Sequence, residues 1–318
     1  MKKSEILALV PLYAPTLAEL EREYTVHKLW AAKDPDALMR QVAGSVRAAV
    51  TTGLAGYSRR HVEALPKLEL IACFGNPHGM SAEDKAAATA RGVVVTNTPD
   101  EITATVAELA LGLMIAVLRR IAEGDRFVRA GKWAAGPPPP GRSLDGKTCG
   151  IIGLGRIGRE IARRAEVFGM AVRYHGPRKK ADAPYPYHPD LAEMAGQCDC
   201  LVAMCPLTPQ TRGLVDARVL AALGPEGFFI NMARGPVADQ PALIAALMER
   251  KIAGAGLDVY WDEPNVPAEL VAMENVVLTP HIGSTTREIR EERGRKLLAN
   301  LRAYFAGKPV LNPVMGNG

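Results

Sequence analysis

The stretch that decides the fold is Thr148-Cys-Gly-Ile-Ile-Gly153-Leu-Gly155-Arg-Ile-Gly158. Its apolar start predicts a strand, its G-x-G-x-x-G pattern predicts a tight turn, and the apolar spacing that follows predicts a helix ending at Gly169. Residues 171–174 predict a second strand directly after it. This order is typical of the βαβ unit that holds a dinucleotide diphosphate, so we expect a doubly wound parallel sheet.

The glycines of this turn have separate predicted tasks. Gly153 allows the tight turn, Gly155 lets the backbone approach the diphosphate, and Gly158 lets the helix pack closely on the strand. The N–H groups at the start of the helix then face the phosphate charge. We therefore predict cofactor contacts from Gly153, Leu154, Gly155, Arg156, Ile157 and Gly158.

The segment after the second strand predicts which dinucleotide binds. It reads Tyr174-His175-Gly176-Pro177-Arg178-Lys179-Lys180, and its first carboxylate is Asp182. NAD-binding units usually place an acidic residue here for the ribose 2′-OH, whereas basic side chains attract a 2′-phosphate. We predict that NADP(H) is preferred and NAD(H) possible, with His175, Gly176, Arg178 and Lys179 as contacts.

The rest of the chain predicts two α/β domains, each a doubly wound parallel sheet. A flavodoxin-like substrate domain comprises residues 1–100 with 286–318, and a Rossmann-type dinucleotide domain comprises residues 101–285. A long helix is expected over residues 102–121, and an extended arm with four prolines over 131–140. The predicted strands lie at residues 6–10, 48–51, 70–74, 93–96, 148–152, 171–174, 201–204, 228–231, 255–258 and 276–278.

Composition narrows the class of protein. The chain has 318 residues, 48% hydrophobic, and a net charge of +5, with basic and acidic residues interleaved. Neither a nucleic-acid motif nor an apolar run of the ~18 residues that span a membrane is present. Five cysteines make no disulfide framework, and the cluster Cys198, Cys200, Cys205 lacks zinc spacing. We expect a cytoplasmic enzyme without a metal, a nucleic-acid partner or a membrane anchor.

Three further segments lie at the carboxyl ends of predicted strands: Asn231-Met-Ala-Arg234-Gly235, Gly256-Leu-Asp258-Val-Tyr-Trp-Asp-Glu263-Pro264 and Thr279-Pro-His281-Ile-Gly-Ser284. Taken singly, each polar residue is more often a surface or capping residue. Together they supply a cation for a carboxylate and its neighbouring carbonyl, an acid, and a carboxylate that orients the acid. This set suits the reduction of a 2-keto acid.

These segments resemble the D-isomer-specific 2-hydroxyacid dehydrogenase family, most of all its glyoxylate/hydroxypyruvate reductase branch. The likeness covers nearly the whole chain. Other motifs that carry it are Arg91-Gly-Val-Val-Val-Thr-Asn-Thr-Pro99, Val106-Ala-Glu-Leu-Ala-Leu-Gly112 and Pro206-Leu-Thr-Pro-Gln-Thr-Arg-Gly-Leu214.

The resemblance implies roles for particular residues. Arg234 would bind the substrate carboxylate and carbonyl, His281 would donate the proton, and Glu263 would orient His281. Glu263 also argues against formate dehydrogenases of the superfamily, which have glutamine there. A homodimer is expected, in which the 131–140 arm meets the partner subunit. Trp133 could close the partner's pocket, although an aromatic residue in such a place more often packs in the core or against the arm. Asp258 would face the nicotinamide, and the cofactor contacts extend to Val106, Pro206, Thr211, Met232, Ala233 and Gly283.

The substrate loop departs from the family pattern. Relatives usually have a run like V-G-x-G-x-D whose N–H groups bind the substrate carboxylate, whereas this chain reads Phe74-Gly75-Asn76-Pro77-His78-Gly79. Pro77 has no N–H to donate. Either Gly75 and Asn76 suffice as donors, or carboxylate binding depends more on Arg234. We predict a substrate site of Phe74, Gly75, Asn76, Arg234 and His281.

The favoured function is NADPH-dependent reduction of a small 2-keto acid, similar to glyoxylate or hydroxypyruvate, to the D-2-hydroxy acid. Two alternatives stay open. One is an NAD-dependent D-2-hydroxyacid dehydrogenase that oxidises another acid. The other is a non-catalytic protein that senses dinucleotides.

Overall fold

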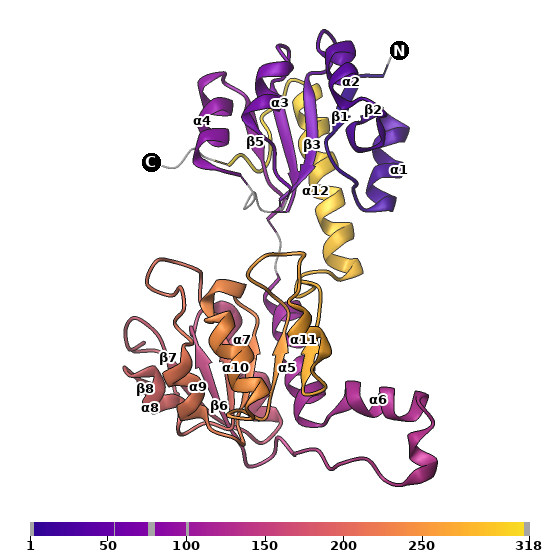
Figure 1. Cartoon of the computed structure of the whole chain (residues 1–318). Coiled ribbons are helices and arrows are strands. Elements are labelled where there is room, and N and C mark those ends of the chain that lie inside the picture. The colour runs from indigo at the N-terminus through magenta and orange to yellow at the C-terminus, as the bar shows by residue number, and fades with distance from the viewer. Residues whose placement is uncertain (1–2, 54, 76–79, 100–101, 315–318) are drawn as a thin grey trace. The chain divides into compact units, whose positions relative to one another are not determined.

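The computed structural model describes residues 3–53, 55–75, 80–99 and 102–314. The chain folds as two compact units: unit 1 is Met1–Glu101 with Thr286–Gly318, and unit 2 is Ile102–Thr285. Each unit is a parallel sheet with helices on both faces (Figure 1). The predicted fold class, two doubly wound α/β sheets, is confirmed.

Unit 1 has five parallel strands in the order β2-β1-β3-β4-β5, which is the flavodoxin-like order. Leu20 and Leu297 pack on one face of this sheet, and Met39 and Val62 pack on the other. Because both faces are covered, a central strand such as β4 is buried throughout. The elements are β1 (Glu5–Ala8), α1 (Ala14–Glu23), β2 (Thr25–Lys28), η1 (Leu29–Ala31), α2 (Pro35–Val42), β3 (Ala48–Thr52), α3 (Arg59–Ala64), β4 (Leu70–Phe74), α4 (Ala82–Ala90), β5 (Val94–Thr96) and α12 (Arg287–Phe305).

Unit 2 has seven parallel strands in the order β12-β11-β10-β9-β6-β7-β8. The chain leaves β6 toward β7 and later returns to its other side as β9, so the topological switch point lies between β6 and β9. The elements are α5 (Thr103–Leu118), α6 (Ile121–Arg129), η2 (Lys132–Ala135), β6 (Thr148–Ile152), α7 (Arg156–Val167), β7 (Ala171–His175), β8 (Tyr187–His188), α8 (Leu191–Ala195), β9 (Cys200–Ala203), α9 (Ala217–Leu223), β10 (Phe228–Asn231), η3 (Gly235–Val237), α10 (Gln240–Met248), β11 (Gly254–Leu257), α11 (Ala268–Ala272) and β12 (Val276–Leu278).

The predicted helix over residues 102–121 is wrong at its end. Helix α5 stops at Leu118, and Arg120 adopts a left-handed φ of 55° before α6 begins. At this point the N–H of Arg142 on the returning chain donates to the Leu118 carbonyl, the acceptor that a continuing helix would use. Periodicity within one segment carries no information about such a partner. The sequence also missed β2 and the two-residue β8, which lack an apolar run.

Helix α6 and the segment after it project from unit 2 (Figure 1). Helix α6 buries none of its residues, and Ile121, Val128 and Trp133 are 53%, 55% and 67% exposed. Such a run of exposed apolar side chains is typical of a surface that another protein covers. Among the helices of the described residues, none has the length and apolar character required to cross a membrane.

Candidate active site

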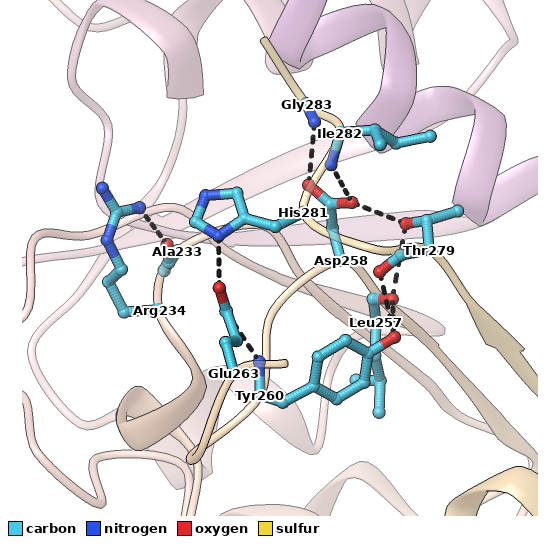
Figure 2. Close-up of polar contacts among 10 residues, drawn as sticks. All are labelled: Ala233, Arg234, Leu257, Asp258, Tyr260, Glu263, Thr279, His281, Ile282 and Gly283. Carbon is cyan, nitrogen blue, oxygen red and sulfur yellow. Dashed lines mark hydrogen bonds and ion pairs between the residues drawn. The ribbon is translucent and has the colours of Figure 1, made fainter. Parts of the chain in front are cut away.

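His281 and Glu263 form a hydrogen-bonded pair (Figure 2). His281 Nδ1 lies 2.6 Å from Glu263 Oε2, and Glu263 Oε1 accepts the Tyr260 N–H at 3.1 Å. Both oxygens of the carboxylate are therefore engaged. Because a carboxylate oxygen accepts, Nδ1 carries the hydrogen and Nε2 points away from Glu263. The pair is part-exposed, at 26% and 30%, so a small molecule can reach it.

Asp258 holds the loop that carries His281. Its Oδ1 accepts from Ile282 N at 2.8 Å and from Thr279 Oγ1 at 2.6 Å, and its Oδ2 accepts from Gly283 N at 2.9 Å. His281 itself has a left-handed φ of 52°, a conformation that costs a non-glycine residue about 1–3 kcal/mol. The buried Asp258 carboxylate therefore stabilises the turn, a role that the sequence analysis missed. The position of Asp258, an acidic residue directly after the buried strand β11, was the sequence feature that could have indicated this role.

Tyr260 ties the neighbouring segments together. Its hydroxyl donates to the carbonyls of Leu257 and Thr279, at 3.2 and 3.0 Å. Burial raises the pKa of Tyr260 to about 12, so this hydroxyl stays protonated at neutral pH. It is a structural donor that links the ends of β11 and β12.

Arg234 follows β10 in a turn that Asn231 shapes. Asn231 Oδ1 accepts the Ala233 N–H at 3.1 Å, and Arg234 Nη1 donates to the Ala233 carbonyl at 2.6 Å. A Cβ on Gly235 would lie 2.0 Å from the Tyr260 backbone, so only glycine permits this close packing. The contact fixes the turn that carries Arg234 against the segment that carries Glu263. In Figure 2 the His281 imidazole extends toward the side on which Arg234 lies.

The three side chains thus come from the carboxyl ends of adjacent strands β10, β11 and β12. A guanidinium can bind a carboxylate and polarise a carbonyl, and an imidazole fixed through Nδ1 can exchange a proton through Nε2. The structure therefore brings together Arg234, Glu263 and His281 within unit 2.

The glycine turn fits a dinucleotide diphosphate. Gly153 has a φ of 97°, and a Cβ there would lie 2.8 Å from Cys205 Cα. A Cβ on Gly158 would lie 2.2 Å from the Gly153 carbonyl oxygen. A Cβ on Gly155, in contrast, would meet no atom within 4 Å. Gly153 and Gly158 thus permit the close packing of turn and helix, while the surface at Gly155 is open to a ligand.

Other predicted cofactor residues meet beside this edge. A Cβ built on Gly283 would lie 3.2 Å from Asp258 Oδ2, 3.2 Å from Met232 Cε and 3.6 Å from Val106 Cγ2. Thr211 closes the turn after β9, since its hydroxyl donates to the Pro206 carbonyl at 2.7 Å.

Packing limits several of the predicted cofactor contacts: Val106 and Met232 are 6% and 4% exposed, and two others are buried further. Leu154 is 2% exposed and Ala233 is also 2% exposed, so their side chains belong to the core. Only the backbone of either residue is left for a ligand. Arg156, at the start of α7, and Ile157 are more accessible.

The basic segment starts at the carboxyl end of β7. The His175 carbonyl accepts the Gly153 N–H at 2.9 Å, so this residue adjoins the glycine turn. The Lys180 N–H donates to Tyr174 Oη at 2.7 Å, and Asp182 pairs with Arg159 at 2.7 Å. Arg178 and Lys179 are exposed, and no carboxylate of the described residues pairs with them.

The predicted substrate loop lies in unit 1, where it is described only in part. Phe74 ends β4 and is 9% exposed. The N–H of Gly75 donates to Thr98 Oγ1 at 2.7 Å, so it is already bonded within unit 1. Asn76 lies outside the described residues. Of the two open readings, this bond favours the one in which Arg234 carries more of the carboxylate binding.

The part of the chain that the structure describes contains no group of three or more metal-ligating side chains. All five cysteines are buried and unpaired. Burial raises the pKa of Cys198 and Cys73 to about 12, so neither thiol is a ready nucleophile.

Comparison with known proteins agrees with this geometry. Residues 111–283 match the model of the "D-isomer specific 2-hydroxyacid dehydrogenase, NAD binding domain". The chain is 42% identical to the glyoxylate/hydroxypyruvate reductase A of Arabidopsis thaliana over 99% of this chain and 100% of that protein.

Solved structures give the same result. A 2-hydroxyacid dehydrogenase from Ketogulonicigenium vulgare Y25 matches with a TM-score of 0.88 and 41% identity over 99% of both chains. An NADPH-dependent glyoxylate/hydroxypyruvate reductase from Sinorhizobium meliloti, in complex with NADP and malonate, matches with a TM-score of 0.80 and 37% identity, over 99% of this chain and 97% of that one. The predicted family and the nicotinamide dinucleotide cofactor are confirmed. The chain belongs to the D-isomer specific 2-hydroxyacid dehydrogenase family, as an NAD(P)-dependent oxidoreductase of its glyoxylate/hydroxypyruvate reductase-like branch.

Proposed function

We propose that the protein reduces a small 2-keto acid of the glyoxylate or hydroxypyruvate type to the D-2-hydroxy acid, with NADPH preferred over NADH. The hydrogen-bonded pair of His281 and Glu263, beside Arg234, is the observation that carries the proposal. The substrates named for the Arabidopsis and Sinorhizobium relatives agree with this chemistry.

In this proposal Arg234 binds the substrate carboxylate and polarises the adjacent carbonyl. His281 donates a proton from Nε2 to the carbonyl oxygen as negative charge develops there. Glu263 accepts the Nδ1 hydrogen and so orients the ring with Nε2 directed away from the carboxylate. Asp258 acts as a positioning residue because it holds the turn that aims His281.

The cofactor is assigned to unit 2, which corresponds to the predicted dinucleotide domain. Its diphosphate would meet the backbone of Gly153, Gly155 and Arg156, and its ring would lie near Asp258 and Gly283. When bound, the nicotinamide supplies the hydride that reduces the carbonyl carbon. Substrate contacts from Phe74, Gly75 and Asn76 in unit 1 stay a prediction, and the N–H of Gly75 is already bonded to Thr98 Oγ1.

The preference for NADPH rests on the segment after β7. Arg178 and Lys179 are exposed and lack a carboxylate partner among the described residues, while Asp182 is paired with Arg159. Two such cations suit a dianionic 2′-phosphate and give the ribose 2′-OH no acceptor.

A homodimer is also proposed, with the arm from α6 to the four prolines against the partner. The exposed Ile121, Val128 and Trp133 support this assignment. Analytical ultracentrifugation should give twice the monomer mass, and Val128→Lys should shift the protein toward monomer. A monomeric wild type would contradict the homodimer. A cytoplasmic location remains a prediction.

The decisive experiment follows absorbance at 340 nm with a panel of 2-keto acids and each reduced cofactor. The proposal expects turnover of glyoxylate or hydroxypyruvate and a higher kcat/KM for NADPH. Turnover only in the oxidising direction with NAD would favour a dedicated dehydrogenase. Tight dinucleotide binding without turnover of any acid would favour a sensing protein.

A further inference from the structure

His175 occupies the place that selects the cofactor in a doubly wound sheet. It is the last residue of β7, and its carbonyl accepts the Gly153 N–H at 2.9 Å. The acidic residue that binds a ribose 2′-OH usually stands at this end of the second strand. Here the position has an imidazole, a group whose charge changes near neutral pH.

One nitrogen of this imidazole is already committed. His175 Nδ1 lies 2.9 Å from the carbonyl oxygen of His188, its partner in register on β8. A carbonyl oxygen can only accept, so Nδ1 carries a hydrogen in both charge states of the ring. Any proton that the ring gains or loses is therefore at Nε2. That atom is an acceptor when the ring is neutral and a donor when it is charged.

We propose that His175 is a proton-linked selector of the cofactor's 2′ group. Neutral His175 accepts from the 2′-OH of NAD(H), and protonated His175 donates to the 2′-phosphate of NADP(H). A fixed acidic residue would favour NAD(H) at every pH, whereas this imidazole makes the preference depend on pH. This inference rests on the assignment of the dinucleotide to unit 2 and deepens the proposed preference for NADPH.

The carboxylates near His175 are paired with other residues, which is consistent with this role. Two carboxylates on neighbouring segments have other partners. Glu193 on α8 lies 3.9 Å from His188 Nδ1, and Asp182 lies 2.7 Å from Arg159 Nη2. The 2′-phosphate is therefore the anion that the imidazole gains when NADP(H) binds, and its charge favours the protonated ring. The other titratable or charged groups on the neighbouring segments include Arg156, Glu160, Arg163, Arg164, Glu166, Arg173, Tyr174, Arg178, Lys179, Lys180, Tyr187 and His188.

Two consequences follow near neutral pH. Binding of NADP⁺ takes up protons at His175, and the preference for NADP⁺ over NAD⁺ weakens as the pH rises. The phosphate itself titrates near ~6, and pairing it with cations releases protons, which is the opposite sign. The difference between wild type and a variant without the imidazole separates the two effects.

Isothermal titration calorimetry of NADP⁺ and NAD⁺ in buffers of different ionisation enthalpy tests this without turnover. The wild type should take up more protons per NADP⁺ than His175→Gln, and its NADP⁺/NAD⁺ affinity ratio should fall about 5–10-fold from pH 6.5 to 8.5, within what one shifted group can give. In His175→Gln the ratio should not fall over this range, because the titration of the phosphate near ~6 acts in the opposite direction. The control His188→Gln keeps its backbone acceptor and should behave as the wild type.

The outcomes separate this inference from the proposed function. Equal proton uptake and equal pH dependence in wild type and His175→Gln would overturn the role of His175. Loss of the uptake in His188→Gln alone would move the proton to that residue and overturn it as well. If NAD⁺ binds more tightly at every pH while the difference between wild type and His175→Gln persists, the preference for NADPH fails and the selector stands.

Discussion

The carboxyl edges of the two sheets are held in different ways. In unit 2, side chains fix side chains and loops: Glu263 orients His281, and Asp258 binds the N–H groups of Ile282 and Gly283. In unit 1, the loop after β4 turns its first N–H inward, from Gly75 to Thr98. The side chains proposed to carry out the reaction are therefore held in place within unit 2. The loop after β4 in unit 1 is the segment that departs from the expected family pattern. Substitutions in unit 2 should lower the rate of reaction, and at Arg234 also weaken substrate binding. Substitutions beside the loop of unit 1 should change the substrate KM and leave kcat nearly unchanged.

The largest effect is expected for His281→Ala, which removes the proposed proton donor. We expect kcat to fall by ~10²–10⁴, the usual contribution of general acid catalysis. Initial rates with NADPH and glyoxylate measure it, and the dissociation constant of NADPH should stay unchanged. His27→Ala, at a histidine of unit 1, is the control. Unaltered turnover in His281→Ala would exclude this residue as the proton donor.

Arg234→Ala should rank next. Loss of a preorganised cation at the carbonyl typically costs ~10²–10³ in rate, and kcat/KM for acids with a carboxylate should show it. Arg234→Lys should recover only part of the lost kcat/KM, because an ammonium cannot form the two parallel hydrogen bonds of a guanidinium. The control is Arg218→Ala, which breaks an exposed pair with Asp190. If Arg234→Ala and Arg218→Ala have similar kinetics, Arg234 does not bind the substrate.

Asp258→Asn tests whether positioning matters on this edge. The amide replaces one of the two oxygens that hold the 279–283 turn, and a displacement of 1 Å can cost ~10²-fold in rate. We expect kcat to fall by about 10–100-fold. The melting temperature should fall as well, because the amide –NH2 faces a backbone N–H that then lacks its acceptor. Wild-type kcat would show that the turn keeps His281 in place without the carboxylate.

Thr98→Val is the corresponding test in unit 1, with the smallest effect on rate. It leaves the buried Gly75 N–H without its acceptor, which should cost about 1–3 kcal/mol of unfolding free energy. Urea denaturation measures this cost, and Thr98→Ser is the matched control because it keeps the hydroxyl. The substrate KM should rise while kcat changes little. A fall in kcat at constant KM would contradict the division between the two edges.

Sequence patterns predicted the two sheets well, because these depend on local order, and they also picked out the polar residues that the structure places after β10, β11 and β12. The glycine spacing at 153–158 and the polar residues after β10, β11 and β12 are local features of parallel strands. Contacts between residues that lie far apart in the sequence could not be predicted from local patterns. The end of α5 depends on Arg142, the use of the Gly75 N–H depends on Thr98, and the hold of Asp258 on its turn is a tertiary bond.

The most direct test of the pair at the centre of the site is a double-mutant cycle on Glu263→Gln and His281→Ala. If Glu263 acts only through His281, by orienting its ring, the double variant should reduce glyoxylate no more slowly than His281→Ala alone, since residues that act as a unit are not additive. If the two losses in kcat multiply, the carboxylate and the imidazole act independently, and the proposed pair is contradicted.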